Sequence, residues 1–355
     1  MTNQDIATLR LANQGIATTT PQTAVDIVGR MGAMQAQDYY GSLWAIGLRA
    51  HSTEKEILKA IDACQIVRTW PQRGTLHFVL AEDARWLVSL SAERMLRGAK
   101  RQREQLGIDE KLLEQSEVVI TQALSSGLLT RPKLMELLED AGISTKSGRG
   151  YYILWHLSQS GVTFIGPMEG KQQTVGLLNS LPVHHSYDRE AGIAELAKRY
   201  FTSHGPATLA DFIGWSGLTS KDAKAGLAAN AHALTGRVVA GTEYWLPKTS
   251  VKPEGDATCY LLPGFDEYLL GYKDRSAVLH PDNFPKIVPS SNGIFLSTIV
   301  IDGQIVGTWK RTVKRDHVAV ALTPFTSFSA ADSAALQRSI EHYSSFLGLP
   351  VKIEG

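Results

Sequence analysis

Two glutamines lie close together in the segment GAMQAQDYYGSLW, at Gln35 and Gln37, with Asp38 next to them. In an extended backbone the side chains of residues i and i+2 point the same way, whereas on a helix they lie about 200° apart. If the loop is extended, both amides can reach one small molecule. Because the pair directly follows an apolar helical pattern, we interpret it as a candidate site.

Glutamine cannot act as a general base, so the pair suits a reaction in which a water is held in place. Release of an N-alkylated purine from DNA is such a reaction. The alkylated base already carries positive charge and leaves readily, so a positioned water and stabilisation of an oxocarbenium-like sugar could supply most of the catalysis. Asp38 could add electrostatic stabilisation. The alternative is that both amides cap a helix or satisfy buried backbone groups.

The segment RGTLHFV carries a second group of polar side chains. Strict alternation along a strand places Thr75, His77 and Val79 on one face, and Arg73 precedes them. We predict that Arg73, Thr75 and His77 support the site. The alternative is that His77 is an ordinary core or surface residue.

The segment FDEYLLGYKDR has two interpretations, a buried polar network or a surface that faces DNA. Leu269 and Leu270 in its middle favour the buried network. The polar side chains concerned are Asp266, Tyr268, Tyr272, Asp274 and Arg275.

The net charge favours no class of protein, since 36 Lys and Arg face 35 Asp and Glu, a formal charge of +1. Contacts to phosphates need only a local basic stripe. We predict one DNA-binding stripe on a helix and another around a hairpin end; a solvated helix face and a charged edge strand are the alternatives. The first stripe comprises Arg94, Arg97, Lys100, Arg101 and Arg103, and the second Lys310, Arg311, Lys314 and Arg315.

Sequence motifs of the common enzyme classes are missing. The chain has no GxSxG elbow, HExxH helix, P-loop or dinucleotide fingerprint. Cys64 and Cys259 stand alone, without a CxxC motif or a histidine at ligand spacing, so neither a disulfide framework nor a structural zinc site is predicted.

Three segments repeat an order of helices followed by a β-hairpin, which is typical of winged-helix units. The segment TRPKLMELLEDAG is a predicted helix with Thr130 as N-cap, Pro132 in the first turn and Gly142 at the exit. GYYILWHLSQSG forms a second helix, and VTFIGPMEGKQQTV a hairpin. Helices over 193–201, 205–217 and 219–230 precede a hairpin in RVVAGTEYWLP. The first hundred residues vary the theme, with strands in IVRTW and TLHFV.

The last hundred residues predict a β-rich region. FLSTIVIDGQIVGTWKR alternates apolar and polar positions around Asp302-Gly303, a strong hairpin signal, and a helix over 330–347 packs back on the sheet through Leu336, Ile340 and Tyr343. The predicted fold class is α+β, with winged-helix segments at 1–108, 109–185 and 186–250 and a β-rich segment at 251–355.

Length and composition fit a cytoplasmic globular protein with more than one core. The chain has 355 residues, of which 43% are hydrophobic, enough for several packed units. The start, MTNQDIATLR, shows no signal-peptide pattern, and no run of eighteen apolar residues predicts a membrane span. The isolated cysteines fit a reducing compartment.

Several motifs, taken together in this order, resemble the AlkZ-like winged-helix DNA glycosylases. They are NQGI at Asn13, QAQ at Gln35, RTWPQRGTLHFVLAED from Arg68, LLPGFDEYLLGYKDRSAVL from Leu261 and NGIFLSTIVIDGQIVGTWKR from Asn292, and they span nearly the whole chain. The family's QxQ signature maps onto Gln35 and Gln37. The related YcaQ-like branch carries Asp at the second position. Because this sequence has Gln37 there, it resembles the QxQ branch.

The resemblance implies tandem winged helices wrapped into a C-shape that excise bulky or cross-linked N-alkylpurines from double-stranded DNA, with no metal or organic cofactor. We expect a monomer, because several winged helices in one chain can surround DNA without a partner. A DNA-binding regulator or architectural protein without catalysis explains the fold but not the glutamine pair, and regulators usually bind palindromes as dimers. A scaffold for other proteins is a third alternative and predicts no DNA affinity.

Overall fold

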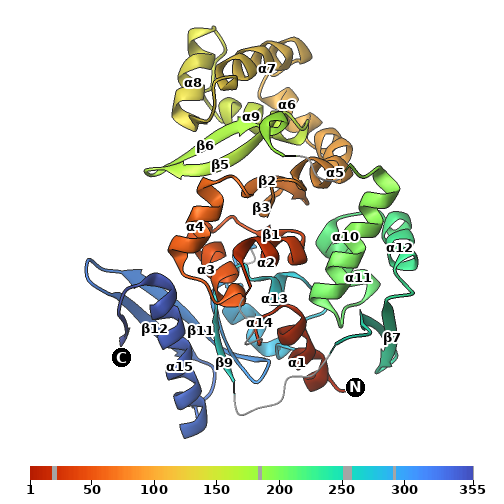
Figure 1. Cartoon of the computed structure of the whole chain (residues 1–355), viewed down its shortest axis with the longest axis vertical. Coiled ribbons are helices and arrows are strands. Elements are labelled where there is room, and N and C mark those ends of the chain that lie inside the picture. The colour runs from red at the N-terminus through yellow and green to blue at the C-terminus, as the bar shows by residue number, and fades with distance from the viewer. Residues whose placement is uncertain (18–21, 183–185, 251–257, 291–292, 355) are drawn as a thin grey trace. The chain divides into compact units, whose positions relative to one another are not determined.

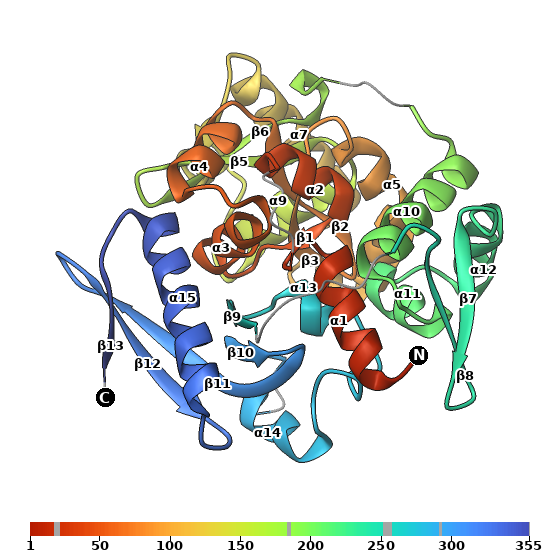
Figure 2. The ribbon, with the colours of Figure 1, turned by 60° about the horizontal axis from the view of Figure 1, so that its bottom comes forward.

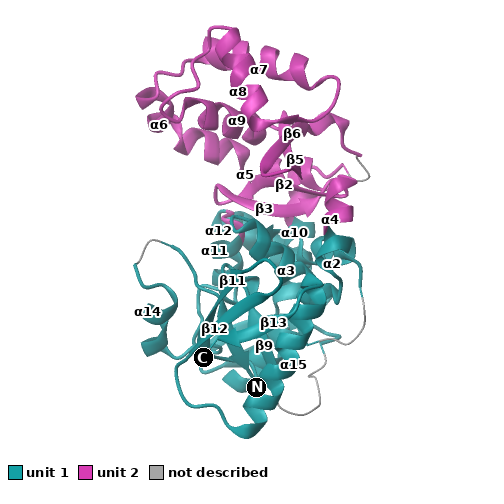
Figure 3. Cartoon of the chain, turned by 90° about the vertical axis from the view of Figure 1, so that its left-hand side faces the viewer, with its two compact units in different colours: residues 1–57, 194–215, 219–355 teal, residues 58–193, 216–218 magenta. Residues whose placement is uncertain are grey.

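The computed structural model describes residues 1–17, 22–182, 186–250, 258–290 and 293–354. They form two compact units, unit 1 with residues 1–57, 194–215 and 219–355, and unit 2 with residues 58–193 and 216–218 (Figures 1 and 3). Asn292, residues 184–185 at a predicted boundary, and residues 251–257 of the predicted last segment lie outside the described residues. The division at residues 108, 185 and 250 stays a prediction.

Helices account for 48% of the described residues and strands for 21%, which confirms the α+β class. Unit 1 holds α1 (Asn3–Asn13), α2 (Ala24–Met31), β1 (Met34–Gln35), α3 (Tyr39–Ala50), α12 (Ser220–Ala229), β7 (Leu234–Val239), β8 (Thr242–Pro247), β9 (Cys259–Leu262), α13 (Glu267–Leu270), η2 (Pro281–Asn283), α14 (Phe284–Ile287), β10 (Thr298–Ile301), β11 (Gln304–Val313), β12 (Val318–Pro324), α15 (Ala330–Leu347) and β13 (Val351–Glu354). The helices α4 (Glu54–Asp62), α10 (Arg189–His204) and α11 (Leu209–Ser216) have residues in both units.

The sheet of unit 1 has the strand order β13-β12-β11-β10-β9. Its β10–β11 hairpin turns at Asp302 and Gly303, whose φ angles of 48° and 83° are both positive. Two-residue turns of this kind match the twist of the flanking strands, and Asp-Gly is a preferred pair there. The hairpin predicted from the sequence is confirmed.

The helix α15 packs against β9 of this sheet (Figure 2). Its residues Leu336, Ile340 and Tyr343 are buried, as the helical spacing predicts. Tyr343 also lies in an aromatic cluster, with its ring centroid 4.8 Å from that of Trp44 and 5.3 Å from that of Trp309. This cluster joins α3 to the sheet.

Residues 189–247 form three helices followed by the β7–β8 hairpin, in the predicted order. Thr219 caps α12 by accepting a hydrogen bond from the Asp222 amide, and threonine is one of the preferred residues at this position. The order of elements fits a winged helix, although that assignment stays a prediction.

Unit 2 has its strands in the order β3-β2-β5-β6-β4. Thr130 lies at the N-cap of α8 and Pro132 in its first turn, and α9 and the β5–β6 hairpin follow, so this element order is confirmed. Leu134 and Leu138 join a buried apolar cluster with residues of α7 and α9. The elements of unit 2 are β2 (Ile66–Gln72), β3 (Thr75–Leu80), α5 (Ala84–Gly98), α6 (Lys100–Gln105), α7 (Glu110–Leu124), β4 (Leu129–Thr130), α8 (Arg131–Asp140), α9 (Arg149–Gln159), β5 (Thr163–Glu169), β6 (Gln172–Leu177) and η1 (Leu178–Ser180).

A buried ion pair connects α3 to the segment before α13. Arg49 is fully buried and donates both terminal nitrogens to the Asp266 carboxylate, at 2.8 and 2.9 Å. The same guanidinium donates to the Gln14 side-chain oxygen at 2.7 Å. These bonds hold α1, α3 and α13 together in the interior of unit 1.

We predict that Arg49→Met lowers the free energy of unfolding by about 3–5 kcal/mol, because it leaves the Asp266 carboxylate buried without its cation. Urea unfolding measures the change. Lys133→Met is the control: Lys133 pairs with Glu136 on an exposed helix face, and losing such a pair costs about 1 kcal/mol or less. A loss as small for Arg49→Met would contradict the prediction.

Candidate functional site

The glutamine pair lies on the short extended segment between α2 and α3. The helix α2 begins at a capping box of Thr23 and Asp26. It ends at Met31 and is followed by Gly32, whose φ of 77° turns the chain out of the helix. β1 follows and ends at Gln35. The segment leaves Gln35 buried and Gln37 exposed.

The two amides meet. The Gln35 side-chain nitrogen donates to the Gln37 side-chain oxygen at 2.5 Å, and the Gln37 backbone amide donates to the Gln35 side-chain oxygen at 3.1 Å. The convergence expected of an extended backbone is therefore present. Part of the alternative interpretation is present too, because one of these bonds satisfies a backbone group.

Asp38 is the N-cap of α3, and its carboxylate accepts a hydrogen bond from the Gly41 amide at 3.1 Å. A side chain at position 41 would collide with it, since a Cβ there would lie 2.4 Å from an Asp38 oxygen. Asp38 thus fixes the first turn of the helix that follows the glutamines. Its electrostatic role stays a prediction.

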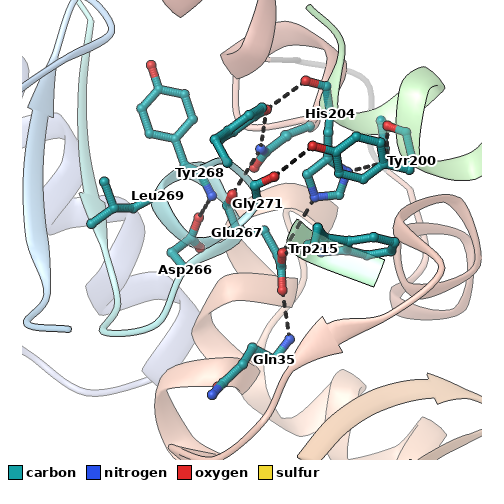
Figure 4. A network of polar contacts seen from close by, with 12 residues as sticks. Gln35, Tyr200, His204, Trp215, Asp266, Glu267, Tyr268, Leu269 and Gly271 are labelled. Carbon is teal, nitrogen blue, oxygen red and sulfur yellow. Dashed lines mark hydrogen bonds and ion pairs between the residues drawn. The ribbon is translucent and has the colours of Figure 1, made fainter. Parts of the chain in front are cut away.

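Glu267 contacts Gln35 and was missed by the sequence analysis. Its carboxylate accepts a hydrogen bond from the Gln35 backbone amide at 3.0 Å through Oε1 and from the Trp215 indole at 2.9 Å through Oε2 (Figure 4). His204 Nε2 lies 3.5 Å from Oε2, at the outer limit of a hydrogen bond. Glu267 is only 2% exposed. The one available signal was its place inside the FDEYLLGYKDR motif.

A second layer of polar contacts surrounds this carboxylate. The Gln14 side-chain nitrogen donates to the Tyr272 hydroxyl at 3.0 Å, and that hydroxyl donates to the His204 carbonyl at 2.7 Å. Asp266, Tyr268 and Tyr272 are buried, so the network interpretation of the motif holds for these three. Asp274 is exposed and Arg275 half-buried.

Burial determines the protonation of the groups in this network. The pKa of His204 lies below its ordinary value because the ring is fully buried, and the nearby Glu267 carboxylate opposes this shift. Burial also raises the pKa of Tyr200 and Tyr272 well above the usual range of tyrosine. His204 is accordingly neutral near pH 7 and stacks on Tyr200, with ring centroids 4.7 Å apart.

The second predicted group, Arg73, Thr75 and His77, lies in unit 2, whereas the glutamines belong to unit 1. His77 is buried in β3, with Nδ1 2.8 Å from the Thr75 carbonyl oxygen and Nε2 3.4 Å from the Gln72 side-chain nitrogen. Arg73 and Gly74 form the β2–β3 turn with positive φ angles of 53° and 70°. These contacts hold the hairpin, and the supporting role of the three residues stays a prediction.

The basic residues 94–103 occupy two helices instead of the single one predicted. α5 ends at Gly98 and α6 begins at Lys100, and the weak helix propensity of glycine fits a break there. Three of the cations also have acidic partners, since Arg97 pairs with Glu93, Lys100 with Glu104 and Arg103 with Glu110. These carboxylates offset part of the positive charge of the stripe.

The second stripe surrounds the β11–β12 turn as predicted, but its four residues differ in their exposure to solvent. Lys310, Lys314 and Arg315 are exposed. Arg311 is half-buried and donates to the Tyr343 hydroxyl at 2.9 Å, and its guanidinium carbon lies 5.9 Å from the centroid of the Tyr40 ring. Arg311 thus has a structural contact with α15 and another with the first turn of α3, three residues after Gln37.

Within the described ranges, no group of three or more His, Cys, Asp or Glu side chains has the arrangement of a metal site, and no helix is long and apolar enough to cross a membrane. Both cysteines are free thiols, and burial raises the pKa of Cys259 to about 12. The polar chemistry near the glutamines is therefore that of amides, carboxylates, tyrosines and one neutral histidine.

A family model described as DNA glycosylase AlkZ-like matches residues 28–346. The chain belongs to the AlkZ-like DNA glycosylase family. It is therefore an enzyme of a family that acts on DNA, and the resemblance found in its motifs is confirmed.

Two comparisons with proteins of Streptomyces sahachiroi agree with this assignment. The chain is 26% identical to an interstrand DNA cross-link repair glycosylase over 369 aligned positions, which cover 97% of each protein. It also matches the solved structure of the DNA glycosylase AlkZ over the full length of both chains, with a TM-score of 0.81 and 22% identity. The second likeness establishes the fold.

We predict that the free energy of unfolding falls as the pH drops below 6.5. The unfolded chain binds a proton at His204 with the ordinary pKa of 6.5, whereas burial lowers the pKa in the folded state. The stability contributed by the neutral ring is present above pH 6.5 and is lost as the pH falls through the folded pKa, by up to about 1.4 kcal/mol per pH unit.

Chemical denaturation between pH 5 and 7.5 measures this slope. Because the pKa values of His156 and His342 are lowered by burial as well, His204→Phe should reduce the slope without abolishing it. His232→Gln, at an exposed position, is the control and should leave the slope unchanged. An unchanged slope in His204→Phe would contradict the assignment to this ring.

Proposed function

We propose that this glycosylase excises bulky or cross-linked N-alkylpurines, of the N7-alkylguanine type, from double-stranded DNA. Membership of the AlkZ-like family supports the class of reaction, and the similarity to the interstrand DNA cross-link repair glycosylase of S. sahachiroi supports the class of lesion. The observation that carries the role of the site is the mutual contact of the Gln35 and Gln37 amides, one of them on an exposed residue.

The proposed step is hydrolysis at the anomeric carbon. Water adds to C1′, the bond from C1′ to the base nitrogen breaks, and its electron pair neutralises the positive charge of the alkylated base; one proton of the water passes to solvent. Because the base leaves as a neutral molecule, no strong acid is needed. An amide can both donate a hydrogen bond to a water and accept one from it. Because hydrogen bonds already hold the two glutamines in place, their side chains need to move little when they bind the water.

The proposal includes the assignment of the helix–helix–hairpin segments as winged helices and of the β11–β12 turn as a phosphate contact. The exposed Lys310, Lys314 and Arg315 support the latter. Arg311 is a poor probe of DNA binding because its contact with Tyr343 has a structural role. The protein would bind DNA as a monomer.

We predict that Lys310→Glu and Lys314→Glu each weaken binding to every duplex sequence to a similar extent, because phosphate contacts carry no sequence information. Each change should also make the plot of log affinity against log salt shallower by about one. Fluorescence anisotropy at several salt concentrations measures both. Lys111→Glu, an exposed lysine on α7, is the control; an equal effect of the control would contradict the specific role of the turn.

We predict that the protein releases the base from a labelled duplex carrying one N7-alkylguanine, so that hot alkali then cleaves the strand at the abasic site. Gln35→Ala and Gln37→Ala should each slow single-turnover excision roughly thirty- to a thousandfold, the loss of about 2–4 kcal/mol expected when one oriented group is removed. DNA affinity should change little, because the contact with the water is made mainly in the transition state. The melting temperature should change least in Gln37→Ala, whose side chain is exposed, and fall moderately in Gln35→Ala, which loses two hydrogen bonds of a buried side chain.

Gln37→Asp should retain part of the activity, since a carboxylate can still accept a hydrogen bond from the water. Equal excision by wild type and the double alanine variant, with stability unchanged, would refute the role of the pair. Unfolding of both alanine variants would support the structural alternative. A wild-type protein that binds every alkylated duplex but cleaves none would favour a binding protein without catalysis.

A further inference from the structure

Glu267 is a buried carboxylate with a separate donor at each oxygen. Oε1 accepts from the Gln35 backbone amide at 3.0 Å, and Oε2 accepts from the Trp215 indole at 2.9 Å. With 2% of its surface exposed, the side chain cannot contact DNA directly. Any effect of Glu267 on the reaction must therefore pass through the residues that it binds.

The donor on Gln35 is a backbone group, so the bond fixes the course of the main chain. The same residue holds Gln37 through two bonds of its side chain, at 2.5 and 3.1 Å. A shift of the Gln35 backbone would consequently move both amides. Bonds to an ionised acceptor are stronger than neutral ones, and the buried position excludes competing water.

We infer that Glu267 is the positioning residue of the glutamine pair, and this rests on the proposed function of that pair. The position requires a carboxylate. Only an ionised carboxyl group accepts at both oxygens, whereas an amide of the same shape would turn its NH₂ group toward one of the two N–H donors. The charge and hydrogen-bonding geometry of the side chain at position 267, and not its volume alone, would then determine the rate of excision.

The test is Glu267→Gln in the full chain, with the duplex that carries one N7-alkylguanine. Single-turnover excision should slow roughly ten- to a hundredfold, the effect of losing one hydrogen bond to a charged group. The Kd for the same duplex should stay within about twofold, because phosphate contacts determine affinity. This split between rate and affinity separates positioning of the pair from a general loss of structure.

A second variant tests the geometry directly. Trp215→Phe removes the indole donor at Oε2. In Glu267→Gln/Trp215→Phe the amide oxygen can then accept from Gln35, while its NH₂ group faces the phenyl ring and His204 Nε2, an atom that can accept a hydrogen bond in a neutral imidazole. The double variant should excise faster than Glu267→Gln and approach the rate of Trp215→Phe. A residue needed only for folding predicts the opposite, because two losses of stability would add or reinforce each other.

Asp211→Asn is the matched control. Asp211 is another buried carboxylate of unit 1, and it accepts from the Thr208 and Lys273 backbone amides at 2.9 and 2.8 Å. We expect it to lower the melting temperature while leaving the excision rate of the folded protein unchanged. If it slows excision as much as Glu267→Gln does, the effect is not specific to Glu267 and the inference fails.

Wild-type excision by Glu267→Gln would overturn the inference, as would a double variant no faster than Glu267→Gln. If Glu267→Gln does not fold, the double variant is compared with Trp215→Phe alone: equal rates support the inference, and a tenfold slower double variant overturns it. The alanine variants of the pair separate the two proposals. Slow Gln35→Ala with normal Glu267→Gln refutes positioning only, whereas normal Gln35→Ala and Gln37→Ala refute the role of the pair itself.

Discussion

Two neighbouring carboxylates, Asp266 and Glu267, are buried at the beginning of α13, and much of unit 1 is arranged to supply them with donors. A buried charge is costly unless it is paired and hydrogen-bonded. Arg49 from α3 supplies the cation for Asp266, and the Trp215 indole and the Gln35 amide supply N–H groups to Glu267. Elements separated by more than 200 residues in the sequence are thereby held at one point, since Gln35 and Glu267 are 232 positions apart.

That constraint explains how a short extended loop can have a defined conformation. β1 is only two residues long. The conformation of the loop depends on Gly32, the C-cap of α2, on Asp38, the N-cap of α3, and on the hydrogen bond to Glu267. Functional groups must be held within about half an ångström of their productive positions, and supporting contacts usually provide this. At this loop that contact is the hydrogen bond from the Gln35 backbone amide to the Glu267 carboxylate, next to the bond between the two glutamine side chains.

The sequence predicted well those parts of the fold that local signals determine. The turn at Asp302-Gly303 and the helix that begins after Thr130 depend on residues next to one another, and both are confirmed. The meeting of the two glutamines followed from their spacing in an extended segment. Glu267 was missed because nothing local distinguishes it from any acidic residue beside apolar neighbours. Its role depends on a long-range contact, which one sequence without its relatives does not reveal.

The same limit applies to the charged residues. In the sequence, Arg311 is one of four basic residues near a turn. In the structure its hydrogen bond to Tyr343 and its contact with the Tyr40 ring link β11 to α15 and α3.

A near-neutral chain is compatible with a substrate whose base is already cationic. A strongly positive site would oppose both that base and the oxocarbenium-like sugar, whereas phosphate contacts can be confined to a few exposed lysines. If the glutamines hold the water as proposed, uncharged amides beside a buried anion are the side chains that such a reaction permits.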